Sequence, residues 1–261
     1  MKRLIDRITL ASGYLNPIVL ASDRRFDVRC IRRVAPSVLV CHEYEFVYCR
    51  VPKSANTTML NLLYESIEGK GIKAWDRNNL TRRYFSSLGG RTLLKANVPL
   101  NNYFFFTVVR NPYDRILSAY LDKFSMPEYR GRYPSVYHPK YKVNPAENYN
   151  SFLKHLVSSR QFMFSDHHWV PQYLFLLPSL DRIDYVGKVE SLTFDYSDIA
   201  KRLKLPFLKK IDSSFRGQGV STTSSTEKRD VFYSEDIFGR ENKKIVSELY
   251  ERDFIDFGYE F

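Results

Sequence analysis

The feature that most constrains the fold is a strand, a loop and a helix that follow one another three times along the chain. Short runs rich in β-branched and aromatic residues alternate with segments whose apolar residues recur at helical spacing. The predicted strands are 37–51 (one or two strands), 103–109 and 184–188, and the predicted helices follow them at 57–68, after Pro112 and at 193–203. This order predicts an α/β fold with a P-loop-like central parallel sheet flanked by helices.

The length and composition indicate one globular domain. The chain has 261 residues, of which 44% are hydrophobic and 15% aromatic, enough for a packed core. No Pro/Gly-rich linker divides it, so we predict a single domain over residues 1–261 that ends in a helix at 240–257. The three cysteines, Cys30, Cys41 and Cys49, are not spaced as a zinc site, and we expect free thiols.

The net charge points to an anionic partner. The formal charge is +11, from 40 Lys and Arg against 29 Asp and Glu. Nucleic acid, a phosphorylated cofactor, an acidic glycan and a membrane surface all fit this balance. The N-terminus is faintly like a signal peptide, but Asp6 and Arg7 interrupt it. Without an apolar stretch of about 20 residues to span a bilayer, the sequence predicts a soluble, cytoplasmic protein.

The loop after the first predicted strand is a candidate anion site. Small and hydroxylated residues join strand to helix there, and Lys53 precedes them. The amides of the first helical turn, the hydroxyls of Thr57 and Thr58 and the Lys53 ammonium would suit a phosphate. An ordinary helix start, with Asn56 or Thr57 as N-cap, explains the same residues. The loop lacks the glycines of a Walker A sequence, and the 103–109 strand ends in arginine, so use of ATP or GTP is disfavoured.

The loop after the second strand carries a second candidate anion site. Arg110 leaves the strand, Pro112 suits the first turn of a helix, and Ser118 falls two turns along. A guanidinium and a hydroxyl suit one phosphate group. Alternatively, Arg110 is a structural ion-pair partner and Ser118 a small residue at a helix contact.

These stretches resemble a known family. Pro52-Lys53-Ser54-Ala55-Asn56-Thr57-Thr58 resembles the 5′-phosphosulfate loop of sulfotransferases, and the segment from Arg110 to Tyr120 resembles their 3′-phosphate motif. The likeness is to the Golgi-type carbohydrate sulfotransferases, including the chondroitin 4-O and heparan/uronyl 2-O enzymes. Four ordered blocks over about residues 43–259 carry it, the other two being His168-Trp169-x-Pro171 with 184–192, and 249–259.

The resemblance implies a donor, 3′-phosphoadenosine 5′-phosphosulfate (PAPS). Because Lys53 and the helix N-terminus would stabilise the leaving group, we expect no metal. Lys53 would lie at the oxygen that bridges phosphorus and sulfur, and Arg110 and Ser118 would hold the 3′-phosphate. A family lid over the donor corresponds in position to 213–229, with Arg216 and Gly217 as weaker matches. The remaining donor contacts would come from Ser54, Ala55, Asn56, Thr57 and Thr58.

The general base is less well marked. The uronyl 2-O branch has a histidine before the 3′-phosphate strand, whereas residues 91–99 contain none. A base of the 2-O type is therefore not expected. His168 occupies the His-Trp-x-Pro position of the family that the chain resembles, and it is our candidate for the catalytic base, with His167 as a lesser one. A buried histidine that orients a loop is the competing interpretation of His168.

The segment 123–149 is a candidate acceptor-side insertion. Tyrosines and basic residues alternate in it, a mixture that suits an anionic sugar chain, single-stranded nucleic acid, or a loop packed by its own tyrosines. We expect a glycan acceptor, with no nucleic-acid partner and no integral membrane segment. A basic nucleic-acid-binding protein and a nucleotide-dependent phosphotransferase remain the alternative functions.

Overall fold

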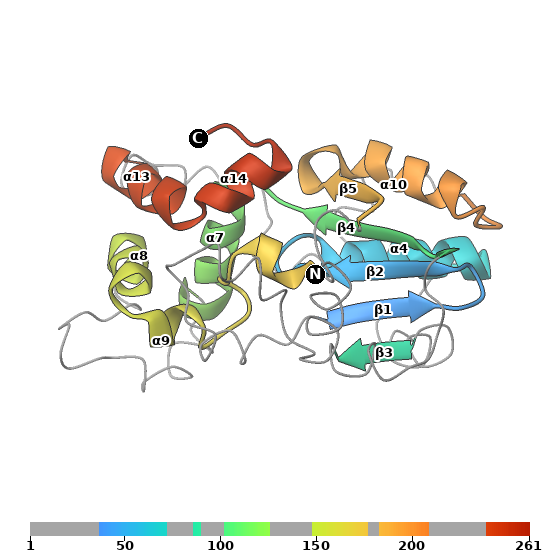
Figure 1. Ribbon diagram of the computed structural model, residues 1–261, viewed down its shortest axis with the longest axis horizontal. Coiled ribbons are helices and arrows are strands. Elements are labelled where there is room, and N and C mark those ends of the chain that lie inside the picture. The colour runs from blue at the N-terminus through green and yellow to red at the C-terminus, as the bar shows by residue number, and fades with distance from the viewer. Residues whose placement is uncertain (1–36, 72–85, 90–101, 126–147, 177–182, 209–238) are drawn as a thin grey trace, which may run out of the picture. The chain divides into compact units, whose positions relative to one another are not determined.

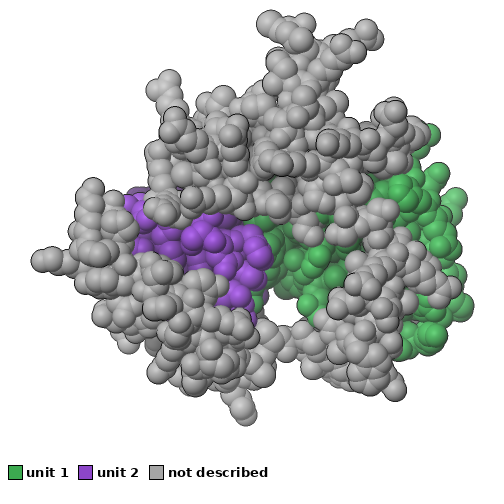
Figure 2. Space-filling model, turned by 90° about the horizontal axis from the view of Figure 1, so that it is seen from below, with its two compact units in different colours: residues 1–109, 172–219 green, residues 110–171, 220–261 purple. Residues whose placement is uncertain are grey.

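The computed structural model describes residues 37–71, 86–89, 102–125, 148–176, 183–208 and 239–261. The chain divides into two compact units, which are coloured separately in Figure 2. Unit 1 comprises 1–109 and 172–219, and unit 2 comprises 110–171 and 220–261. Each unit is described by itself below.

Unit 1 is built on a five-stranded sheet in the order β3-β1-β2-β4-β5 (Figure 1). β2 pairs in parallel with β4, and β4 in parallel with β5, whereas β1 is antiparallel to both of its neighbours. The strands are β1 (Ser37–Cys41), β2 (Phe46–Arg50), β3 (Ser86–Gly89), β4 (Phe104–Val109) and β5 (Tyr185–Lys188).

The α/β prediction is thus confirmed, but the expectation of a parallel sheet is wrong for one edge. A tight turn over residues 42–45 reverses the chain, with Glu45 in the left-handed region at φ 48°, and pairs β1 with β2 as a hairpin. In the parallel part, the C-terminal ends of the strands share one edge. The chain leaves that edge after Arg50, Val109 and Lys188, where the sequence predicted ligand-binding loops.

Two helices pack on one face of this sheet. They are α4 (Asn56–Glu68) and α10 (Leu192–Arg202), each within one residue of the range that its apolar spacing predicted. Alternate strand residues form the core beneath them, so Tyr48 and Phe106 stack with centroids 4.9 Å apart. α4 ends at Gly69 in the left-handed conformation, where a Cβ would lie only 2.9 Å from the Phe207 ring. Short 3-10 turns at Gln172–Phe175 and Val189–Ser191 complete the unit's described elements.

The two described cysteines are free and buried, as predicted for Cys41 and Cys49. Burial raises the pKa of the Cys41 thiol, so this side chain behaves as an inert apolar group. Cys30 lies outside the described residues, as does the N-terminal segment 1–36 on which the cytoplasmic prediction depended. Among the helices that the structure describes, none combines the length and the apolar character needed to cross a membrane.

Unit 2 is helical around an aromatic core. α7 begins at Pro112, as predicted, and continues directly into a π-helix. Phe152 lies at the centre of the core, where it contacts Tyr120, Phe124 and Trp169 at centroid distances of 5.4–5.6 Å. The elements are α7 (Pro112–Tyr120), the π-helix (Leu121–Ser125), α8 (Tyr149–Ser158), α9 (Arg160–Met163), α13 (Arg240–Leu249) and α14 (Glu251–Phe257).

The predicted closing helix over 240–257 is two helices, with the break at Tyr250. The backbone of Tyr250 leaves helical geometry, at φ −112° and ψ 22°, and its side chain is buried. Its hydroxyl donates a 2.6 Å hydrogen bond to the carbonyl oxygen of Trp169, which satisfies a polar group that would otherwise be buried alone. The break therefore positions a tyrosine that ties the C-terminal helices to the segment around Trp169.

Replacing Tyr250 by phenylalanine is expected to lower the free energy of unfolding by about 1–2 kcal/mol, because the Trp169 carbonyl loses a buried donor. Urea denaturation followed by circular dichroism measures this. Tyr103→Phe is the matched control, since that hydroxyl bonds His42 at an exposed position and should change stability by less than about 0.5 kcal/mol. Equal effects of the two changes would contradict a special role for the Tyr250 bond.

Candidate active site

The loop between β2 and α4 contains two residues in an uncommon backbone conformation. Lys53 and Ala55 both lie in the left-handed region, at φ 66° and 55°, without being glycine. Each such residue costs on the order of 1–2 kcal/mol and persists only where the surroundings hold it. Backbone turns of this kind gather N–H groups into concavities that bind anions. The conformation of the loop is therefore itself an indication of a site.

The start of α4 has no side-chain cap, although the sequence offered two. Ala55 occupies the N-cap position, and none of the described side chains caps the helix there. Asn56, a predicted cap, instead accepts a 2.9 Å hydrogen bond from the Tyr48 hydroxyl. The interpretation of this segment as an ordinary capped helix start is therefore wrong. The amides of the first turn, flanked by the half-buried Thr57 and Thr58, are suited to a bound anion.

Gln172, which the sequence analysis missed, holds this loop through a hydrogen bond to Ser54. Ser54 is fully buried, and its hydroxyl donates to the Oε1 atom of Gln172 at 3.2 Å. Gln172 is also fully buried and directly follows the His168-Trp169-x-Pro171 block. Its position after that block was the available signal, but a lone glutamine carries no recognisable chemistry. Ser54 is therefore a structural member of the loop rather than an exposed hydroxyl.

The second predicted loop begins where β4 ends. Arg110 is half-buried and directly follows Val109. Asn111 caps α7, because its side-chain oxygen accepts a 2.9 Å bond from the Tyr113 amide, and Pro112 occupies the first turn. Ser118 lies half-buried two turns along α7. The start of α7 is thus capped by a side chain, in contrast to that of α4, and the candidate anion ligands of this loop are the side chains that the sequence predicted, Arg110 and Ser118.

The buried charge of Arg115 lies near Arg110. Arg115 on α7 is 1% exposed, and burial together with the nearby positive charge of Arg110 lowers the pKa of its guanidinium. The carboxylate of Asp253 on α14, itself fully buried, acts in the opposite direction and favours the charged form. The sequence analysis treated both residues only as parts of motifs. Their electrostatic interaction joins two helices that are far apart in the sequence.

The turn after β5 is organised by Asp195. Its carboxylate accepts hydrogen bonds from the Lys188 amide and the Tyr185 hydroxyl, both at 2.8 Å, and one from the Ser191 hydroxyl. A Cβ at Gly187 would lie 3.2 Å from the Asp195 Cβ, which explains a glycine at this position. Asp195 was not predicted from the sequence, because nothing local marks it as the acceptor for three donors.

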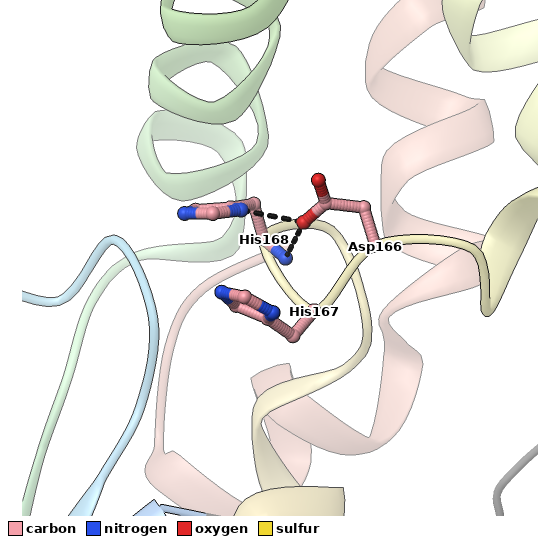
Figure 3. Close-up of side chains that lie close together, drawn as sticks. All are labelled: Asp166, His167 and His168. Atoms are coloured by element: carbon pink, nitrogen blue, oxygen red, sulfur yellow. Dashed lines mark hydrogen bonds and ion pairs between the residues drawn. The ribbon is translucent and has the colours of Figure 1, made fainter. Parts of the chain in front are cut away.

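Asp166, His167 and His168 lie close together in unit 2 (Figure 3). The Oδ1 atom of Asp166 accepts bonds from the His168 backbone N–H, at 2.9 Å, and from the His168 ring at Nδ1, at 2.5 Å. The two imidazole rings have centroids 4.2 Å apart. Partial desolvation of the ring and the neighbouring His168 lower the pKa of His167, although the residue as a whole is exposed. His168 thus has a carboxylate partner at its ring Nδ1.

The predicted donor residues are distributed over both units. Lys53, Ser54, Ala55, Asn56, Thr57 and Thr58 lie together in one loop of unit 1, whereas Arg110, Ser118 and His168 belong to unit 2. Arg216, Gly217 and the rest of the predicted lid, 213–229, lie outside the described residues.

For the predicted acceptor segment, 123–149, residues 126–147 also lie outside the described part. Its last residue, Tyr149, is buried in the aromatic core, in contact with Tyr120 and Phe152. Of the two interpretations left open for this segment, the structure favours a structural role for the Tyr149 ring over an acceptor contact.

Similarity to known proteins agrees with the motifs. Carbohydrate sulfotransferase 10 of Rattus norvegicus is 27% identical over 252 residues, which cover 87% of this chain and 68% of that protein. Carbohydrate sulfotransferase 14 of Homo sapiens is 28% identical over 189 residues, and carbohydrate sulfotransferase 9 of Homo sapiens 25% over 248. These alignments cover 67% and 85% of this chain, but only about half of either relative, 48% and 53%.

A family-level match covers most of the chain. Residues 36–260 match the sequence model described as "Sulfotransferase family". The match includes the loop around Lys53 in unit 1, and the β4–α7 junction with Arg110 and the segment of His168 in unit 2. One family model therefore covers all three candidate segments. On this match, the chain belongs to the sulfotransferase family.

Proposed function

We propose that this protein transfers the sulfuryl group of PAPS to a hydroxyl group of a carbohydrate. The observation that carries the proposal is the strained loop of Lys53 and Ala55 at the uncapped start of α4, an arrangement suited to a phosphosulfate. The carbohydrate as acceptor is supported by the names of the similar proteins, carbohydrate sulfotransferases 9, 10 and 14.

In the proposed reaction, the acceptor oxygen attacks sulfur in line with the bridging oxygen of the donor. A new S–O bond forms as the bond from sulfur to the bridging oxygen breaks, and that electron pair remains on the 5′-phosphate. Lys53 and the first amides of α4 stabilise the charge that develops there. His168 takes the proton of the attacking hydroxyl. Positioning and electrostatics supply the catalysis, and no metal ion is needed in this scheme.

The 3′-phosphate of the donor is assigned to Arg110 and Ser118. Arg110 is supported by its place directly after β4, at the strand edge where ligands bind in parallel sheets. A guanidinium makes directional, charge-assisted bonds to phosphate, and ATP lacks a phosphate at this position. The pair would therefore set the preference for PAPS over ATP.

Family membership favours this function over the two alternatives. A phosphotransferase would need a Mg²⁺-binding acidic residue, whereas the chain leaves β4 through Arg110. A nucleic-acid-binding protein would explain the +11 charge but not the loop at Lys53. The lid at 213–229, the acceptor contacts of 126–147, the single-domain organisation and the cytoplasmic location stay predictions from the sequence.

Calorimetric titration with adenosine 3′,5′-bisphosphate, ATP and AMP, without metal, tests the donor site. We expect the bisphosphate to bind most tightly, and Arg110→Ala to weaken its binding by about tenfold or more, because a charge-assisted bond contributes about 1.5–3 kcal/mol. AMP binding should barely change in that variant.

Arg240→Ala is the matched control, since Arg240 is an exposed residue of unit 2 whose charge lies on α13. Its bisphosphate affinity should equal that of the wild type. Equal affinities for bisphosphate and AMP in the wild type would overturn the donor assignment, and the nucleic-acid alternative would then be tested by salt titration.

A further inference from the structure

Asp166 fixes His168 through two bonds to a single oxygen atom. Its Oδ1 accepts the backbone N–H of His168 at 2.9 Å and lies 2.5 Å from the ring Nδ1 (Figure 3). The first bond closes an Asx turn, and the second sets the ring orientation relative to the same backbone. The side chains of Asp166 and His168 are 12% and 21% exposed, so the pair is largely shielded but reachable.

The segment that carries this pair is anchored on both sides. The carbonyl oxygen of Phe162 accepts bonds from the Ser165 amide, the Ser165 hydroxyl and the Trp169 indole N–H. The carbonyl of Trp169 in turn accepts the buried Tyr250 hydroxyl. The backbone of residues 165–169 is therefore held in place, which is the condition for a pre-organised catalytic group.

The distances favour a hydrogen bond over a metal site. Asp166, His167 and His168 offer ligand atoms within 4.8 Å of one another. Two ligand atoms at about 2.0–2.2 Å from one zinc ion, at a tetrahedral angle, lie more than about 3 Å apart. At 2.5 Å, Asp166 Oδ1 and His168 Nδ1 are too close to share a metal ion in this arrangement, whereas a direct hydrogen bond joins them.

His167 is the less suitable base. Partial desolvation of its ring and the neighbouring His168 lower its pKa, with Lys123 and Arg115 acting in the same direction and Asp166 opposing them. The structure describes no carboxylate bond to the His167 ring. Its ring lies against that of His168, and the free end of the His168 ring points away from Asp166 (Figure 3).

We propose that Asp166 is a positioning residue that holds the proton of neutral His168 on Nδ1 and so leaves the lone pair of Nε2 for the acceptor hydroxyl. The inference rests on the proposed function for the identity of the reaction, but not for the tautomer. The hydroxyl proton passes to Nε2 as the S–O bond forms, and the resulting imidazolium is stabilised by the Asp166 carboxylate. Solvent then removes the proton.

Nitrogen NMR of the full-length protein, labelled at histidine, tests the tautomer without any substrate. In the neutral imidazole, which the spectrum itself distinguishes from imidazolium, the His168 Nδ1 should carry the proton and Nε2 should not. Asp166→Ala should remove this preference, so that both nitrogens show averaged resonances. Glu241→Gln, which removes an exposed carboxylate of unit 2 paired with Lys154, should leave His168 unchanged.

A proton found on Nε2 in the wild type would overturn the inference, as would an unchanged tautomer in Asp166→Ala. Titration with Zn²⁺ distinguishes a metal site: loss of the Nδ1 proton at stoichiometric Zn²⁺ would also overturn it. These outcomes do not depend on PAPS, so they are separable from failure of the proposed function, which the bisphosphate titration decides.

Kinetics with PAPS and unsulfated chondroitin provide the second test. Asp166→Ala should lower kcat about 10²-fold or more, because general-base catalysis typically contributes 10²–10⁴-fold. The KM for PAPS and the affinity for adenosine 3′,5′-bisphosphate should stay within about twofold of the wild-type values. An unfolded variant would lose both, so retained binding shows that the variant is folded. Asp166→Asn, which keeps an acceptor oxygen, should lie between wild type and Asp166→Ala. A kcat within threefold of wild type in Asp166→Ala would contradict the proposal.

Discussion

Replacement of Lys53 by alanine is expected to lower kcat for sulfuryl transfer by about 10²–10³-fold, equivalent to about 2.7–4 kcal/mol of lost transition-state stabilisation. The reason is that negative charge develops on the bridging oxygen as the S–O bond breaks, and the ammonium group is the charged partner proposed for it. Alanine is chosen because it carries a Cβ like lysine. The backbone strain of the left-handed position at φ 66° is therefore the same in the variant as in the wild type. The measurement is transfer of radioactive sulfate from PAPS to chondroitin and to water.

Lys70→Ala is the control for this experiment. Lys70 lies in the same unit, its side chain is 75% exposed, and its ion pair with Glu68, at 3.7 Å, is a surface one. Its kcat should equal that of the wild type. Binding of adenosine 3′,5′-bisphosphate, which lacks the transferred group, should be far less sensitive to Lys53→Ala than kcat. The proposed role of Lys53 would be abandoned if the variant kept a kcat within threefold of wild type.

Asp253→Asn is expected to lower the free energy of unfolding by about 3–5 kcal/mol, the cost of taking one partner from a buried charge pair. Arg115 and Asp253 are 1% and 0% exposed, so water cannot solvate the Arg115 guanidinium once the carboxylate charge is lost. The charge of Asp253 favours the charged form of Arg115, whereas burial of the guanidinium disfavours it. Urea denaturation at neutral pH measures the change, and a loss of this size approaches the whole stability of many domains.

Asp256→Asn on the same helix provides the comparison. Asp256 pairs with Arg252 at 3.2 Å, nearer the surface, and its loss should cost about 0–1 kcal/mol. The double change Arg115→Met with Asp253→Leu removes both charges and should recover most of the stability lost in Asp253→Asn, since apolar replacement of a buried pair is often neutral. A loss in Asp253→Asn no larger than in Asp256→Asn would show that the pair is not energetically special.

The elements that position the site follow from local patterns in the sequence. Apolar spacing over 57–68 predicted α4 within one residue, and the apolar run 103–109 predicted β4. Pro112 marked the first turn of α7. Periodicity and proline act over a few residues, so each is visible without knowledge of the fold.

The interactions that were missed depend on residues far apart in the chain. Gln172 acquires its role from Ser54, 118 positions away, and Asp253 from Arg115. The reversal of β1 was hidden for another reason. Its turn contains no glycine or asparagine, and Glu45 takes the left-handed position instead, so the hairpin carries no usual signal.

Asp166 is an instructive exception, because its partner lies only two residues away. An Asp-x-His sequence was readable, but it is common and has no meaning until the side chains are known to face one another. Composition alone did not distinguish the roles of Tyr149. A tyrosine-rich segment suits a sugar platform as well as a core, and the contact of Tyr149 with Tyr120 shows that this ring belongs to the core.

The left-handed pair in the β2–α4 loop has a consequence for laboratory evolution. A glycine at position 55 would relieve the steric conflict of a Cβ at φ 55°, so a screen for heat resistance would tend to enrich it. Glycine would also free the backbone to leave the conformation that gathers the amides at the start of α4. Thermostable variants that carry changes in this loop are therefore expected to trade turnover for durability.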